Sequence, residues 1–268
     1  SLMILEDGKP LDRPLAWRIS DYCWGIFPAL ASLFAFTALW QFGHDRLGDM
    51  LIPAPLTVLA RARDILATAG RGEVLLTLER GGFGIALALA CGIGAGFIAG
   101  LSRTLVLLLR PINTVLLGTP PIIWVVLAIF WFNMGSTSVV FTVWITVLPL
   151  VFAAAQMSII TIPAPLAEML ESYRVPWLRR LRVLYLPHVL RQLLPALIVA
   201  VGSGLKITVM AELLGSNDGM GSAIASARAM LDTVDVMAYI ILIVAIIMAV
   251  EYGLLEPLRR LFITERRP

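Results

Sequence analysis

Charged residues are scarce in this sequence. Asp, Glu, Lys and Arg make up 15% of its 268 residues and 59% are hydrophobic, whereas an ordinary soluble domain has about 25% charged residues. The mean hydropathy is +0.88. This composition excludes an ordinary soluble globular protein and predicts an all-α, polytopic membrane protein surrounded by lipid. The net charge of +3 is too small to favour nucleic acid as a partner.

Residues suited to metal or redox chemistry are also few. Cys23 and Cys91 both lie in apolar stretches, where a small packing residue is the simpler interpretation. His44 and His188 are far apart in the sequence, so there is no HExxH zinc motif. Lys206 follows VGSGL rather than the glycine-rich loop of a Walker A motif. We therefore expect no catalytic residue, metal or cofactor in this chain, and any ATP hydrolysis must come from another chain.

Uncharged stretches define the predicted membrane spans, because a charge at the bilayer centre costs at least about 2.5 kcal/mol. The run from Pro111 to Ala167 has no ionisable side chain and suits two helices, separated at the polar segment NMGSTS (133–138). The six predicted spans are residues 22–42, 81–102, 119–133, 138–158, 192–214 and 236–255. They form one transmembrane domain, residues 22–256, between an N-terminal segment (1–21) and a C-terminal tail (257–268).

The basic residues predict the orientation of these spans. Six spans place both termini on one side, and the connections on that side carry more than twice as many Lys and Arg residues as the others. Cytoplasmic loops carry such an excess, so both termini should be cytoplasmic in a bacterial inner membrane. The charged loop 164–187 is then cytoplasmic too. Residues 43–80, on the outer side, should contain a proline-marked short helix at the membrane interface.

Two features within the spans have alternative interpretations. Pro120 and Pro121 must break or start a helix, so residues 118–124 either line a pathway or form a plain helix start near the cytoplasmic boundary. Gly92, Gly96 and Gly100 recur every four residues, which predicts close helix packing, with a homodimer seam as the alternative.

Intramembrane charge is confined to the last two spans. Lys206 lies about 20 Å into its helix at roughly 1.5 Å per residue, near mid-bilayer. It either attracts an anionic substrate or makes an internal ion pair or carbonyl hydrogen bond. Glu212, near the outer end, is either on the pathway, solvated, or capping the next turn. Glu251 is expected to snorkel or to pair with Arg259 or Arg260. The candidate pathway residues are Thr119, Pro120, Pro121, Trp124, Lys206, Met210 and Glu212.

The segment AEMLESYRVPWLRRLRVLYLP (167–187) is highly charged although it lies between apolar spans. Residues 168–173 suit a short helix, Val175 is pushed out of the helical region, and Pro176 suits the start of a second helix. In that second helix Leu178 and Leu181 share an apolar face, while the arginines occupy other faces. The pattern predicts an elbow that lies on the membrane surface or docks into a groove of a soluble partner.

This segment resembles the cytoplasmic EAA loop of the permease subunits of binding-protein-dependent ATP-binding-cassette (ABC) importers. The family pattern is Glu-Ala-Ala, three residues, Gly, nine residues, Ile, one residue, Leu-Pro. Aligned on Leu186 and Pro187, Glu168 falls on the family's Glu, Leu184 on its Ile and Arg174 on its Gly. The departure at Arg174 suggests that YRVP replaces the tighter glycine turn.

Three further stretches are similar to the nitrate/sulfonate/taurine branch of these permeases: LIPAPLTVL (51–59), GTPPIIWVVLAIFWFNMGSTSVVF (118–141) and MAELLGSNDGMGSAI (210–224). The resemblance implies a type I importer permease fold, a second permease copy, and ATPase subunits that bind ATP and Mg. It also implies an extracytoplasmic solute-binding protein that meets the outer loop 215–235. The implied substrate is a small anion such as nitrate, a sulfonate or a taurine-like compound.

The resemblance also assigns roles within the elbow, which would be the coupling helix that transmits ATPase motion. The residues implied to act there are Glu168, Leu170, Glu171, Tyr173, Arg174, Pro176, Trp177, Leu178, Arg179, Leu186 and Pro187. Two other classes are a stand-alone secondary transporter or channel, and an intramembrane enzyme. A secondary transporter is expected to carry inverted repeats with charged or broken helices in both halves. The confinement of charge to the last two spans weighs against it, and the missing catalytic motifs weigh against an enzyme.

Overall fold

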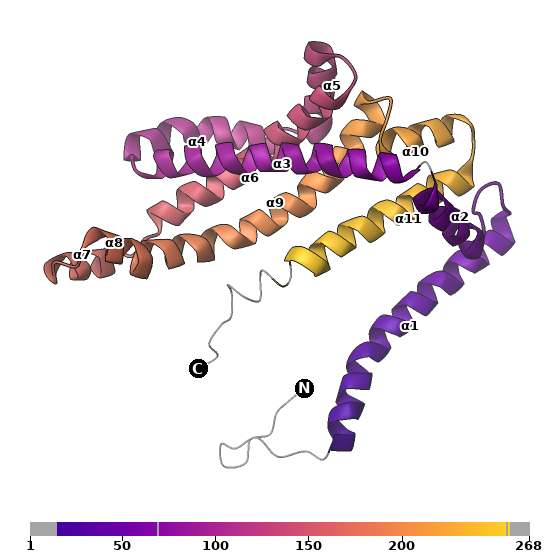
Figure 1. Cartoon of the computed structure of the whole chain (residues 1–268), viewed down its shortest axis with the longest axis horizontal. Helices are drawn as coiled ribbons and strands as arrows, with labels where there is room; N and C mark the ends of the chain where they lie inside the picture. The colour runs from indigo at the N-terminus through magenta and orange to yellow at the C-terminus, as the bar shows by residue number, and fades with distance from the viewer. Residues whose placement is uncertain (1–14, 69, 256, 258–268) are drawn as a thin grey trace. The chain divides into compact units, whose positions relative to one another are not determined.

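The computed structural model describes residues 15–68, 70–255 and 257, and within these ranges it contains helices and no strand (Figure 1). The predicted all-α class is confirmed. The chain divides into two units, residues 1–58 and 59–268. The helices are α1 (Leu15–Leu47), α2 (Pro55–Ala67), α3 (Gly70–Gly100), α4 (Arg103–Gly118), α5 (Pro121–Phe132), α6 (Ser136–Ile160), α7 (Ala164–Ser172), α8 (Trp177–Arg180), α9 (Leu186–Gly215), α10 (Met220–Ala229) and α11 (Thr233–Val250), with π-helical turns at Leu181–Tyr185 and Glu251–Leu255.

The first unit contains α1 and the segment that leads into α2. The indole N–H of Trp40 donates to the carbonyl of Pro53 at 3.0 Å, and Nδ1 of His44 lies 2.8 Å from the carbonyl oxygen of Ile52. These contacts hold the proline-rich segment against the last turns of α1. The short proline-marked helix is present as α2, which begins at Pro55, a residue suited to the first helical position.

Four helical segments of the second unit are long and apolar enough to cross a membrane: Gly70–Gly100, Ser136–Ile160, Trp177–Gly215 and Thr233–Gly253. α4 and α5 meet the same criterion only as a pair, and this pair is bent by 93°. Each of the four single segments overlaps one predicted span. The predicted span 119–133 lies on α5, and the predicted span 22–42 lies in α1.

α4 is a helix that the sequence analysis did not predict, and none of its residues is buried. It ends at Gly118 because Thr119 and Pro120 are extended, with ψ angles of 121° and 139°. Pro121 then occupies the first turn of α5, where a missing N–H costs nothing. The double proline therefore ends one helix and starts the next.

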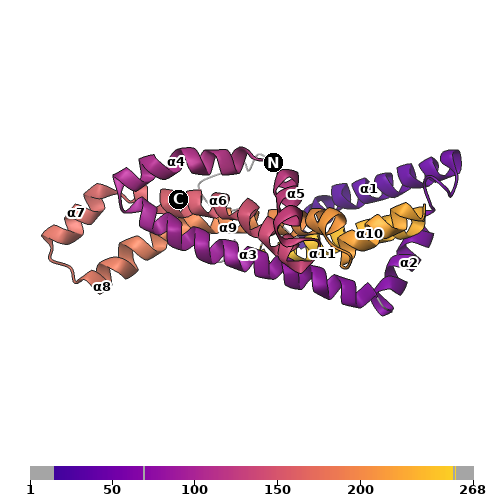
Figure 2. The same cartoon turned by 90° about the horizontal axis from the view of Figure 1, so that it is seen from above.

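The core of the second unit lies where α3, α6 and α9 pack together, as Figures 1 and 2 show. Its buried side chains come from all three helices and, apart from Leu205, are small or β-branched: Ile85, Ala88, Val143, Val147, Val151, Ala200 and Leu205. In lipid, helices associate through close van der Waals packing rather than through a hydrophobic driving force. Side chains of this size allow that close approach.

The glycines of α3 face α6 of the same chain. A Cβ added to Gly92 would lie 2.9 Å from the Cβ of Val151, and one added to Gly96 would lie 2.6 Å from the carbonyl oxygen of Phe152. Gly100 approaches α6 in the same way. The predicted close packing is confirmed, and it is satisfied within one chain.

We expect Gly96→Ala to destabilise the protein by about 1 to 3 kcal/mol, because the added methyl group forces α3 and α6 apart. Gly94→Ala is the matched control, since a Cβ there has no neighbour within 4 Å. The control should be neutral or slightly stabilising, because Ala favours the helix over Gly. Thermal unfolding of the detergent-solubilised chain measures both effects, and equal shifts for the two variants would contradict this packing.

Candidate functional site

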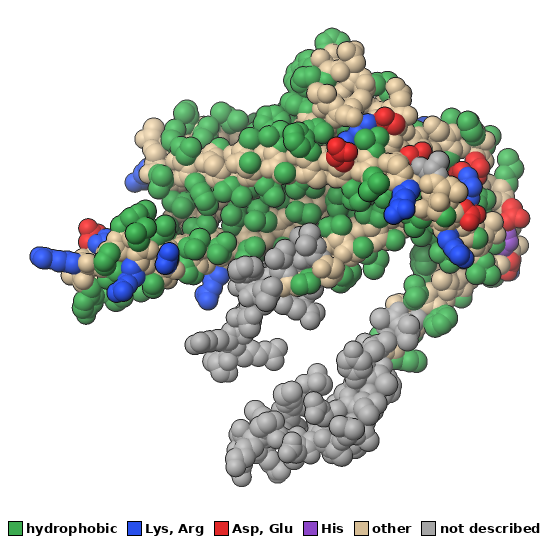
Figure 3. Space-filling model, in the orientation of Figure 1, with side chains coloured by type: hydrophobic (Ala, Val, Ile, Leu, Met, Phe, Trp, Pro, Cys, Tyr) green, Lys and Arg blue, Asp and Glu red, His purple; other side chains and the backbone are tan. Residues whose placement is uncertain are grey.

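We call residues 164–187 the coupling segment. It consists of three elements, α7, α8 and the π-helical turn, followed by the first two residues of α9, and it lies at the end of the second unit away from α10 (Figure 1). None of the residues in these three elements is buried. Figure 3 shows Lys and Arg side chains protruding at this end, whereas the adjoining surface along α3, α6 and α9 is mainly hydrophobic. The segment is thus a charged, exposed projection from an apolar bundle.

The turn between α7 and α8 is built around Arg174, which has a positive φ of 49°. Its N–H donates to the carbonyl of Glu171 at 2.8 Å, and the N–H of Val175 donates to the carbonyl of Leu170 at 3.0 Å. These two bonds and the left-handed residue form a Schellman motif, in which glycine is the favoured residue. The prediction that YRVP replaces the glycine turn is therefore wrong: Arg174 adopts the conformation that favours the family's Gly.

The second half of the elbow is fixed to the first. Pro176 is extended and directly precedes α8, which begins at Trp177, so the second helix starts one residue later than predicted. Nε of Arg180 donates to the carbonyl of Val175 at 2.7 Å, and its guanidinium lies 4.0 Å from the carboxylate of Glu171. The base of the segment is tied by Thr161, whose hydroxyl lies 3.1 Å from Nε2 of His188. The two helices of the elbow therefore form one connected unit.

The apolar side chains assigned to the elbow are largely exposed. Tyr173 is 78% exposed, Leu178 69% and Trp177 64%, and the Trp177 ring lies beside that of Tyr185, with centroids 6.3 Å apart. Leu170 is the exception, because it is partly buried. The other assigned residues are exposed: Glu168, Glu171, Arg174, Pro176, Arg179, Leu186 and Pro187. Exposed aromatic groups on a fixed elbow are typical of a protein-binding surface.

Arg174→Gly should stabilise the turn between α7 and α8, because glycine enters the left-handed region without the steric cost of about 1 kcal/mol that an L-residue has. We expect the amides of Arg174 and Val175 to exchange about fivefold more slowly in the glycine variant. Arg174→Val should exchange faster than the parent protein, since a β-branched residue is a poor fit to this region. Hydrogen-exchange mass spectrometry of the purified chain measures these amides. Indistinguishable exchange in the three proteins would argue against the Schellman turn.

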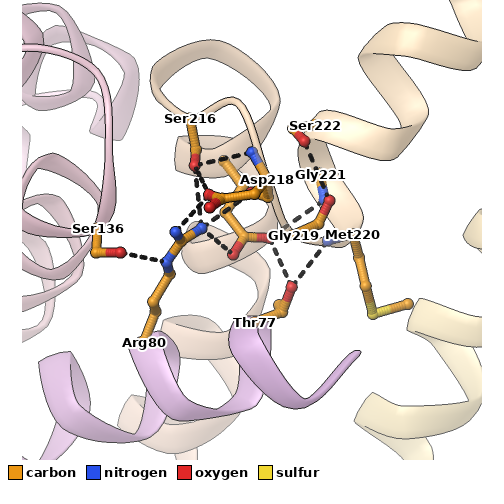
Figure 4. Close-up of polar contacts among 10 residues, drawn as sticks. Thr77, Arg80, Ser136, Ser216, Asp218, Gly219, Met220, Gly221 and Ser222 are labelled. Carbon is orange, nitrogen blue, oxygen red and sulfur yellow. Dashed lines mark hydrogen bonds and ion pairs between the residues drawn. The ribbon is translucent and has the colours of Figure 1, made fainter. Parts of the chain in front are cut away.

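A second polar site lies at the opposite end of α9. We call it the Arg80 cluster; it comprises Thr77, Arg80, Ser136, Glu212, Ser216 and Asp218 (Figure 4). Arg80 is 4% exposed and Glu212 is fully buried, and Nη1 of Arg80 lies 3.1 Å from Oε1 of Glu212. Breaking such a buried pair by removing one partner typically costs about 3 to 5 kcal/mol.

Every oxygen of the Glu212 carboxylate is used. Oε1 accepts from Arg80, while Oε2 accepts from the Thr77 hydroxyl at 2.7 Å and from the Gly221 N–H at 3.2 Å. The alternative that Glu212 is solvated is wrong, whereas its expected capping role is observed at the first turn of α10. Gly219, with φ of 95°, leaves space for this carboxylate, because a Cβ there would overlap it.

Asp218 is the exposed partner of Arg80. The hydrogen bond from Arg80 and then that from Ser216 lower the pKa of its carboxyl group, against an opposing effect of partial burial. A lowered pKa means that this carboxylate stabilises the folded state above its ordinary pKa, and that the contribution is lost as pH falls through the lowered value. The Asp218 contact is therefore intact at neutral pH.

Sequence reasoning missed the role of Arg80, the last residue of the stretch 43–80 that was placed on the outer side. Its guanidinium also donates to Ser216 at 3.0 Å, to the carbonyl of Asp218 at 2.9 Å and to Ser136 at 3.0 Å. The sequence feature that could have indicated a partner for Arg80 is the pair of acids in the stretch 210–224, Glu212 and Asp218. Because two carboxylates already hold this guanidinium, Arg80 is not available to bind a substrate anion.

Lys206 contrasts with Arg80. It is exposed on α9, and among the residues that the structure describes it forms no hydrogen bond or ion pair through its side chain. The alternative of an internal ion pair or a carbonyl hydrogen bond for Lys206 is thus not found in the described part of the chain. Met210, one turn further along α9, is partly exposed. Lys206 therefore offers a free cation on the surface of a membrane-spanning helix.

The other pathway candidates lie at the break between α4 and α5. The Thr119 hydroxyl donates to the carbonyl of Val115 at 2.8 Å, and the buried indole N–H of Trp124 has no acceptor within the described ranges. α5 packs against α9 through Val125 and Ala211, yet no hydrogen bond or ion pair joins this break to Lys206 among the described residues.

Glu251 is exposed, and its two expected partners, Arg259 and Arg260, lie outside the described residues. In the described part of the chain, no group of three or more His, Cys, Asp or Glu side chains could hold a metal ion.

Comparison with known proteins decides the family. Residues 92–256 match the family model described as "Binding-protein-dependent transport system inner membrane component". The chain belongs to this family. It is a permease of the ABC importers, of the nitrate/sulfonate/taurine branch, and a multi-pass inner-membrane protein, so the family prediction is confirmed. The alternative of a stand-alone transporter or channel has no support.

Individual relatives agree with this assignment. The taurine transport system permease protein TauC of Escherichia coli (strain K12) is 27% identical over 269 residues, covering 97% of each chain. The nitrate import permease protein NrtB of Synechococcus elongatus is 25% identical over 220 residues, covering 78% of this chain and 79% of its own. A solved inward-facing structure of the MetNI methionine ABC transporter is similar with a TM-score of 0.54 and 18% identity, covering 76% of this chain and 96% of that chain. This likeness confirms the type I importer permease fold.

Proposed function

We propose that two copies of this chain form the translocation pathway of an ATP-driven importer. ATPase subunits that bind ATP and Mg act on the cytoplasmic side, where both termini lie, and the chain itself has no catalytic role. A solute-binding protein delivers the substrate to the outer loop 215–235. The observation that carries this proposal is the exposed aromatic surface of the coupling segment, at Tyr173 and Trp177, in the place of the family's EAA loop.

The coupling segment is suited to transmit force because it is connected internally and to two core helices. The Schellman turn at Arg174 and the bond from Arg180 to Val175 hold its two halves together. α6 enters the segment and α9 leaves it. A displacement of the segment by an ATPase would therefore move α6 and α9, and α9 carries Lys206. Tyr173, Trp177 and Leu178 would supply the apolar contact, and Glu168, Glu171, Arg174 and Arg179 the polar contacts.

We propose that the substrate is a small anion. Lys206 supports this because it is an exposed cation, and a cation in a membrane span without an internal partner is a functional candidate. The names of TauC and NrtB give taurine and nitrate as the cargo of two relatives. Thr119, Pro120, Pro121, Trp124, Met210 and Glu212 complete the proposed pathway set, and Glu212 would act there by supporting the helix ends.

The coupling proposal is tested by purifying the permease with its ATPase and binding protein in proteoliposomes. We expect Trp177→Ala, and separately Glu168→Ala, to lower substrate-stimulated ATP hydrolysis by at least about tenfold, because each removes a contact of hot-spot size. Phe83→Ala is the control, since Phe83 is an exposed aromatic residue of α3 outside the segment. Taurine and nitrate are the trial substrates. Full uptake by the permease without any ATPase would overturn the proposal.

The role of Lys206 is tested by Lys206→Met, which keeps the length of the side chain and removes its charge. We expect the kcat/KM for anion uptake to fall about tenfold or more, since a charge-assisted contact contributes about 1.5 to 3 kcal/mol. Lys206→Arg should retain most of the uptake, and gel filtration should show intact assembly for both variants. Unchanged uptake by the methionine variant would make Lys206 a structural residue.

A further inference from the structure

Arg80 joins two segments on the outer side of the bundle, the α5–α6 turn and the loop after α9. Within the cluster, no other side chain contacts both segments. Its Nε donates to Ser136, the first residue of α6, while its other two nitrogens bind the loop after α9 through Ser216 and Asp218. A backbone bond runs parallel to this link, from the Gly135 N–H to the carbonyl of Gly215 at 2.8 Å. The loop 216–219 and the α5–α6 turn are therefore held together at two points.

The α5–α6 turn is in turn fixed to α5. Asn133, which ends α5, has a positive φ of 61°, and its carbonyl accepts a hydrogen bond from the Ser138 hydroxyl. Further along α5, Val125 and Ile129 lie against Gly215, where an added Cβ would be 3.3 Å from Ile129. α5 has 12 residues and is about 18 Å long at roughly 1.5 Å per residue. Its other end is the break at Thr119 and Pro120, so a shift of the turn moves the break.

The two acids that hold Arg80 differ in accessibility. Glu212 is fully buried, whereas the side chain of Asp218 is 61% exposed. Loss of the Asp218 contact would leave Arg80 paired with Glu212, so the buried pair would stay intact. A protein that contacts the loop 216–219 from outside can therefore change the Asp218 contact without the cost of unpairing a buried charge.

We propose that Arg80 is a positioning residue that couples the outer loop 216–219 to the α5–α6 turn, and through α5 to the broken helix at Thr119–Pro121. The coupling deepens the proposed function, because it rests on the pathway role of that break. In this arrangement, binding-protein contact at Asp218 repositions Arg80, Arg80 repositions Ser136, and the turn carries the change into α5. Glu212 is the fixed anchor of the arrangement, and Asp218 is its movable contact.

Hydrogen-exchange mass spectrometry of the full chain in lipid nanodiscs tests this coupling. In Asp218→Asn we expect amides of residues 215–222 and also of residues 133–138 to exchange about tenfold faster, as the loss of one charge-assisted hydrogen bond predicts. Glu79→Gln is the matched control, because Glu79 is an exposed acid next to Arg80 that is outside the cluster. It should leave both segments unchanged.

A second variant separates coupling from simple loop anchoring. Ser136→Ala removes the side-chain link to α6 and leaves only the backbone bond from Gly135 to Gly215. Adding Asp218→Asn to it should therefore accelerate exchange in residues 133–138 much less than Asp218→Asn does alone, although residues 215–222 should still respond. If Asp218→Asn alone accelerates only residues 215–222, the cluster merely anchors the loop and the proposal is overturned. The measurement needs no transport, so its failure leaves the importer assignment standing, and a failure of ATP-driven uptake leaves the exchange result standing.

Discussion

The buried ion pair between Arg80 and Glu212 is the interaction on which the end of the bundle opposite the coupling segment depends. A charge in a membrane protein persists only when it is paired or hydrated, and these two side chains are almost entirely removed from solvent. The pairing fixes α3 against α9, because each helix carries one of the two charges. The remaining donors and acceptors of the pair are then satisfied by Thr77, Ser136 and the loop after α9. One electrostatic requirement thereby organises four segments.

The two polar regions of the chain are joined by a single helix. α9 begins at Leu186, within the last two residues of the coupling segment, and ends at Gly215, directly before the loop of the Arg80 cluster. The exposed Lys206 lies between them. The two ends have opposite character, because the coupling segment leaves Tyr173 and Trp177 exposed whereas the Arg80 cluster buries the charges of Arg80 and Glu212. A helix of this kind has one end available to a partner and the other end anchored in the bundle.

The apolar middle of the bundle provides the rigidity that this arrangement needs. The glycines of α3 bring its backbone into contact with α6, and the small side chains of α9 complete the core. Since lipid gives no hydrophobic drive for helix association, close contact between backbones supplies the attraction. At the surface, Arg174 stands where glycine would fit the backbone better. There a residue that fits the left-handed region poorly occupies a turn that glycine favours, and the hydrogen bonds of the Schellman motif keep it in place.

The sequence by itself determined the membrane class, the helical fold, the break at Pro120 and Pro121, and the elbow of residues 164–187. These properties are local: they follow from hydrophobic run length, from the fixed φ angle of proline and from short motif spacing. The sequence also indicated the family, through four similar stretches in the same order.

Only the tertiary structure decided what Arg80 and Glu212 do, because 132 positions separate them in the chain and no short-range pattern links such residues. The structure likewise decided that the α3 glycines meet α6, that Lys206 has no partner within the described chain, and that Arg174 retains the glycine turn. Each of these depends on which side chains the folded helices bring together, and hydropathy and spacing carry no information about that choice.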